Sequence, residues 1–73
     1  MVYFFSCAII KKNTSSIAKT YAGTINLDSR IETRSDYRTT VDRIKECVLK
    51  DAVQKLKMQE SEIAFVLIAF NPL

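Results

Sequence analysis

The sequence predicts a two-layer α+β domain of chain order β-β-α-β, in which a three-stranded antiparallel sheet of order 2-1-3 packs one helix on one face. Three observations predict it. Two segments with strand character come first, a long segment with helical periodicity follows, and a continuous apolar run ends the chain. At 73 residues the chain has room for a single domain, 1–73, and its 48% hydrophobic content with one Gly and one Pro indicates a folded core.

The first two strands are expected at 2–10 and 19–27. Residues 2–10 are rich in β-branched and aromatic side chains, and a polar cluster at 11–16 follows them. Residues 19–27 alternate, with Tyr21 and Ile25 on one side and polar or small residues on the other, which is typical of a half-buried strand. We therefore expect a hairpin with a mobile basic tip and with the second strand at the edge of the sheet.

The helix is expected at 36–57. Ser35 is a suitable N-cap, and Asp36 is favourably placed against the positive end of the helix dipole. Apolar residues then recur every three or four positions, as on one face of an amphipathic helix. They are Tyr37, Val41, Ile44, Val48, Ala52 and Leu56.

The third strand is expected at 62–70, where an apolar run ends before Asn71 and Pro72. A right-handed crossover from the second strand places the third strand beside the first. The first strand is then the central one.

The first and third strands are apolar on both faces, although one helix covers only one face of a sheet. The sequence does not fix which face the helix covers, since either set of alternate residues is apolar. Of the two, we expect the helix to face Tyr3, Phe5, Cys7, Ile9, Ile63, Phe65 and Leu67. The uncovered apolar face would then consist of Val2, Phe4, Ala8, Ile10, Val66, Ile68 and Phe70. Such a patch predicts a homodimer joined through the sheet, either face to face or edge to edge. Alternatively, the long loop or the chain ends fold over this face.

No pattern of catalytic, metal-binding or cofactor-binding residues is visible. The chain has no histidine, which removes the commonest general base and metal ligand. Gly23 is the only glycine, so a glycine-rich phosphate loop is absent. Cys7 and Cys47 are interpreted as buried thiols of a reducing compartment, with a single disulfide between them as the alternative. The apolar runs are too short to span a bilayer. We expect a cytoplasmic, non-enzymatic protein without a cofactor.

The net charge of +3 is concentrated in residues 1–34, which carry five basic and two acidic side chains. The leading hypothesis is a protein-interaction module that self-associates through its sheet. The alternative is a nucleic-acid-binding dimer that uses the basic hairpin loop and nearby arginines. In that alternative a basic rim at one end of the sheet would contact the anionic partner. Its residues are Lys11, Lys12, Lys19, Arg30, Arg34 and Arg38.

Overall fold

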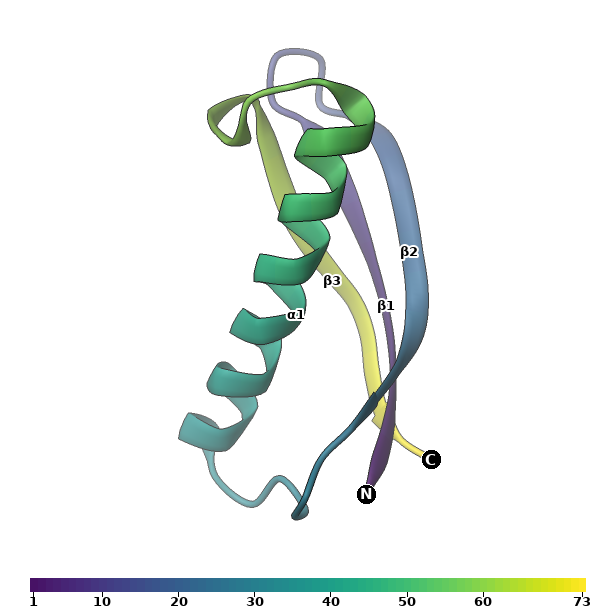
Figure 1. Ribbon diagram of the computed structural model, residues 1–73, viewed down its shortest axis with the longest axis vertical. Coiled ribbons are helices and arrows are strands. Elements are labelled where there is room, and N and C mark those ends of the chain that lie inside the picture. Colours follow the sequence, from purple (N-terminus) through teal and green to yellow (C-terminus); the bar gives the residue numbers. More distant parts are fainter.

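The computed structural model describes all 73 residues and confirms the predicted fold class. The elements are β1 (Val2–Lys11), β2 (Ser16–Asn26), α1 (Arg34–Leu56), a short 3-10 helix η1 (Glu60–Glu62) and β3 (Ile63–Pro72). The sheet has the order β2-β1-β3, and both outer strands run antiparallel to β1. Helix α1 lies across one face of the sheet (Figure 1).

The β1–β2 hairpin turn is shorter than the sequence indicates. Only residues 12–15 lie outside the strands, because β2 begins at Ser16 and not at residue 19. Ser15 adopts a positive φ of 54° to close the turn, and the hydroxyls of Thr14 and Ser16 lie 2.6 Å apart. The backbone amide of Lys12 donates to the carbonyl of Glu62 at 3.0 Å, which ties the hairpin to η1. The polar composition of residues 11–16 hid the start of the strand.

Helix α1 begins two residues earlier than expected, and its N-cap is Thr33 rather than Ser35. The amide of Asp36 donates to Thr33 Oγ1 at 3.0 Å, and the amide of Thr33 donates to Asp36 Oδ2 at 3.3 Å. This reciprocal pair is a capping box, which satisfies two of the amides that a helix start leaves free. Asp36 was correctly placed in the first turn, but its partner is the residue three positions before it.

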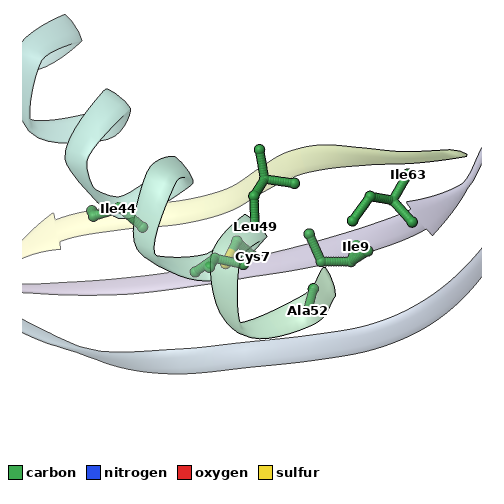
Figure 2. Packing of buried hydrophobic residues seen from close by; sticks show 7 residues of the cluster. Cys7, Ile9, Ile44, Leu49, Ala52 and Ile63 are labelled. Atoms are coloured by element: carbon green, nitrogen blue, oxygen red, sulfur yellow. The ribbon is translucent and has the colours of Figure 1, made fainter. Parts of the chain in front are cut away.

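The core lies between α1 and one face of the sheet (Figure 2). Cys7 and Ile9 of β1 are completely buried, and they pack beneath Leu49 and Ala52 of the helix. The expected orientation is therefore present, with the odd-numbered residues of β1 turned toward α1. The buried cluster comprises Cys7, Ile9, Ile44, Val48, Leu49, Ala52 and Ile63.

Phe70 faces the helix, and its predicted place on the uncovered face is wrong. The β1–β3 register shifts between Ser6 and Cys7, which pair with Ala69 and Leu67, so Ile68 is an extra residue in β3. A bulge of this kind reverses the alternation of all residues beyond it. Phe70 consequently pairs with Phe5 on the helix side.

Phe70 joins an aromatic cluster there. Its ring stacks on Tyr3 with centroids 5.1 Å apart and meets the edge of Tyr37 at 5.6 Å. The hydroxyl of Tyr3 accepts from the amide of Ile31 at 3.0 Å. These contacts fix the first turns of α1 and the loop before them to the end of the sheet that lies opposite the β1–β2 hairpin turn.

Candidate interaction surface

The face of the sheet opposite α1 carries no charged side chain. The strands contain two charged residues, Lys11 and Lys19, and these pair in register with Ile63 and Ile9 on the helix side. We call the opposite surface the open face. Its residues are Val2, Phe4, Ser6, Ala8 and Ile10 of β1, Ile17, Thr20, Ala22, Thr24 and Asn26 of β2, and Ala64, Val66, Ile68, Ala69 and Asn71 of β3.

Large apolar side chains of the open face are in contact with solvent. Ile17 is 64% exposed, Ile68 60% and Val66 45%, while Phe4 and Ile10 are partly exposed. An antiparallel sheet with one solvated face normally alternates to polar residues on that face. Charged residues make up 26% of the chain, so a face of three strands without any of them is a marked departure from the rest of the surface.

The open face has small residues in its middle. Ser6 and Ala8 of the central strand lie beside Ala22 and Thr20 of β2 in the antiparallel register. Ala8 is only 2% exposed, so it adds almost no accessible area, but its small side chain keeps this part of the face low. On β1 and β2 the larger side chains lie toward the strand ends, so the centre of these two strands is shallow, whereas Val66, which pairs with Ala8, and Ile68 project from the middle of β3.

Six of the seven residues predicted for the self-association face lie on the open face, and Phe70 does not. Sequence reasoning misses Ile17, because the polar cluster at 11–16 predicts a loop and the alternation predicts a strand only from residue 19. Ile17 pairs with Ile10 just before the register of β1 and β2 shifts. Its β-branched side chain beside the polar cluster was the signal for an earlier strand start.

The predicted basic rim does not form. Lys11 and Lys12 lie at the hairpin end of the sheet, whereas Arg30, Arg34 and Arg38 lie at the opposite end around the start of α1 (Figure 1). The molecule is 37 Å long in its largest dimension, so the two groups are separated by most of its length. The topology separates them because residues 27–33 follow the end of β2, which is far from the hairpin turn.

Lys19 belongs to neither basic group, because it takes part in a polar cluster between β2 and α1. The hydroxyl of Tyr21 donates to Asp51 Oδ2 at 2.6 Å. The ammonium groups of Lys55 and Lys19 lie 3.5 and 3.9 Å from the same carboxylate, and Lys19 also lies 5.1 Å from the centre of the Tyr21 ring. The cluster connects the edge strand to the helix.

This cluster perturbs two pKa values. Burial and the hydrogen bond to Asp51 raise the pKa of Tyr21 to about 12. The same hydrogen bond, together with Lys55 and Lys19, lowers the pKa of the Asp51 carboxyl, although partial burial acts in the opposite direction. Tyr21 is thus held protonated and Asp51 ionised at neutral pH, which suits a structural link between two elements.

The two cysteines differ in environment, and the prediction that both are buried is wrong for Cys47. Cys7 is buried in the core, where desolvation raises the pKa of its thiol, and Cys47 is exposed on α1. Neither is in a disulfide. Cys47 lies one position before the buried Val48, so it falls just outside the apolar stripe of the helix.

The hollows of the surface are shallow and lie along α1. The largest, of about 730 Å³, is lined by six residues of the first helical turns, including Arg34, Tyr37 and Arg38. No three or more histidine, cysteine, aspartate or glutamate side chains lie together in a way that could hold a metal ion. No helix combines the length and the apolar character needed to cross a membrane.

Comparisons of this chain with protein-family models, with curated proteins and with solved structures gave no match.

Proposed function

We propose that this chain is a small, non-enzymatic interaction module that self-associates through its β-sheet. The single observation that carries the proposal is the open face, which is free of charge, accessible to solvent and mainly apolar on β1 and β3. Exposed apolar surface of this kind is unfavourable in a monomer and is the usual mark of a binding surface.

The size of the chain supports the same proposal. Only ten of the 73 residues are buried, so the core of a single copy is small. Domains of this length bury a modest share of their surface and commonly need a supplement such as oligomerisation. Covering the open face would add a second apolar layer on the other side of β1, the strand that already contributes most to the core.

The alternative, a nucleic-acid-binding dimer, has less support because the six basic residues proposed for it fall into separate places. A groove for a phosphate backbone needs cationic side chains along one continuous path. Here two lysines lie at one end, three arginines at the other, and Lys19 faces Asp51.

The test of the proposal is the solution mass, measured by light scattering or sedimentation over a dilution series at low and high salt. We expect a dimer whose dissociation constant changes little with salt, because the surface that associates has no charges. Binding to nucleic acid would instead weaken steeply as salt rises. A chain that remains a monomer at all concentrations would refute the proposal.

A pair of variants makes the test specific. Val66→Asp places a carboxylate on the open face, and Cys47→Asp places one on the exposed side of α1. Burying two unpaired charges at a two-fold interface costs several kcal/mol, so Val66→Asp should weaken association by at least about a hundredfold. Cys47→Asp should leave the mass unchanged. Equal effects of the two variants would exclude the open face.

A further inference from the structure

We infer that two copies of this chain associate back to back, open face against open face, to give four layers in the order helix, sheet, sheet, helix. The inference rests on the proposed self-association and adds how the copies meet. Two strands could instead pair edge to edge and extend the sheet. The structure offers three reasons for the stacked arrangement.

The first reason is that both edges of the sheet are irregular. The β1–β2 register shifts between Ile9 and Ile10, which leaves Ala18 unpaired, and Ile68 is the extra residue of β3. Bulges bend a strand and interrupt the regular spacing of its outward backbone groups, and they are a common protection against edge pairing. In addition, β3 ends in Pro72, which has no amide to donate.

The second reason is that the open face is complementary to a second copy of itself. A face without charge brings no like charges together when it meets its own copy about a two-fold axis. Its shallow centre, formed by Ser6, Ala8 and Ala22, lets two sheets approach to the spacing of about 10 Å seen in stacked sheets. Val66, which pairs with Ala8, and Ile68 project from β3 beside these small residues and supply larger side chains for the contact.

The third reason is the amount of surface. The accessible surface of the chain is 5243 Å², whereas a compact monomer of 8.3 kDa is expected to expose about 4,600 Å². The excess of roughly 650 Å² accompanies an elongated shape of 37 × 20 × 19 Å, so the chain has surface to spare. A standard interface takes about 800 Å² from each partner, which is on the scale of one sheet face.

The exposed thiol of Cys47 provides the measurement, since Cys7 is buried and will not react. A nitroxide label attached to Cys47 reports the separation of the two helices by pulsed electron paramagnetic resonance. In the stacked dimer the helices lie outside two sheets, so with layers about 10 Å apart the labels are about 30 Å or more from each other. Edge pairing puts both helices on the same face of one continuous sheet. Neighbouring strands of that sheet are about 4.8 Å apart, so the two labels would be roughly 20 Å or less from each other.

The outcomes separate the inference from the proposed function on which it rests. A dimeric mass with a label separation of about 30 Å or more supports the stacked arrangement, and Val66→Asp should then abolish the distance signal. A dimeric mass with a separation of roughly 20 Å or less overturns the stacked arrangement and leaves self-association standing. A monomeric mass overturns both.

Discussion

A substitution of Phe70 tests whether β3 contains the bulge. The structure places Phe70 on the helix side of the sheet, whereas a strand without the bulge would place it on the open face. With Ile68 as an extra residue, Phe70 stacks on Tyr3 and contacts Tyr37 of the helix. Phe70→Ala should therefore reduce the stability of a single copy. With unbroken alternation Phe70 would belong to the open face, and the same change would mainly weaken association.

The expected loss of stability follows from burial and from the aromatic contacts. Truncating a completely buried phenylalanine to alanine costs about 3–5 kcal/mol, and partial exposure of Phe70 reduces this to about 2–3 kcal/mol. A domain of 73 residues has a free energy of unfolding of about 4–11 kcal/mol. One substitution would thus remove a large fraction of the total.

Urea denaturation followed by circular dichroism is the assay, in a Val66→Asp background so that association does not contribute. With a slope near 1 kcal/mol per molar urea, the midpoint for Phe70→Ala should fall by about 2–3 M. Ile68→Ala is the matched control, because Ile68 is 60% exposed and should change the stability by less than about 0.5 kcal/mol. Equal losses for the two variants, or a larger loss for Ile68→Ala, would refute the assignment of faces.

Three further predictions concern the cluster of β2, the helix cap and the thiols. Because burial and its hydrogen bond raise the pKa of Tyr21 from 10.0 to about 12, the stabilisation it provides is complete below about pH 10 and is lost as the pH rises toward 12. Tyr21→Phe should lose this part of the alkaline decline in thermal unfolding, and an unchanged decline would contradict it. Thr33→Ala should lower the free energy of unfolding by about 1 kcal/mol, whereas Ser35→Ala should be nearly neutral; the reverse order would restore Ser35 as the N-cap. A thiol reagent should modify Cys47 rapidly and Cys7 only after unfolding, and rapid modification of both would contradict the buried position of Cys7.

The candidate surface was partly predictable from the sequence. The apolar residues at even positions of β1 and at 66 and 68 of β3 were assigned to one face from alternation alone, and the structure places them there. Alternation fails only beyond an extra residue, which is why Phe70 was assigned to the wrong side. A bulge depends on how two neighbouring strands twist against one another, and a single segment carries no signal of it.

The basic residues show a different limit. Lys11 and Arg30 are 19 positions apart in the sequence; Lys11 ends β1, and Arg30 lies four residues after the end of β2. The antiparallel hairpin, which the sequence also predicts, puts these two positions at opposite ends of the sheet. Grouping residues by charge without assigning strand ends produced a rim that the topology rules out.

The sequence by itself determined the order of the elements and the strand order of the sheet, because hydrophobic periodicity acts over short stretches of chain and a crossover has a fixed hand. The tertiary structure decided which face of β1 meets the helix, the two bulges, the position of Phe70 and the Tyr21–Asp51 link. Each of these depends on contacts between segments distant in the chain. Such contacts are set by the twist and packing of the assembled sheet and helix, which no local pattern encodes.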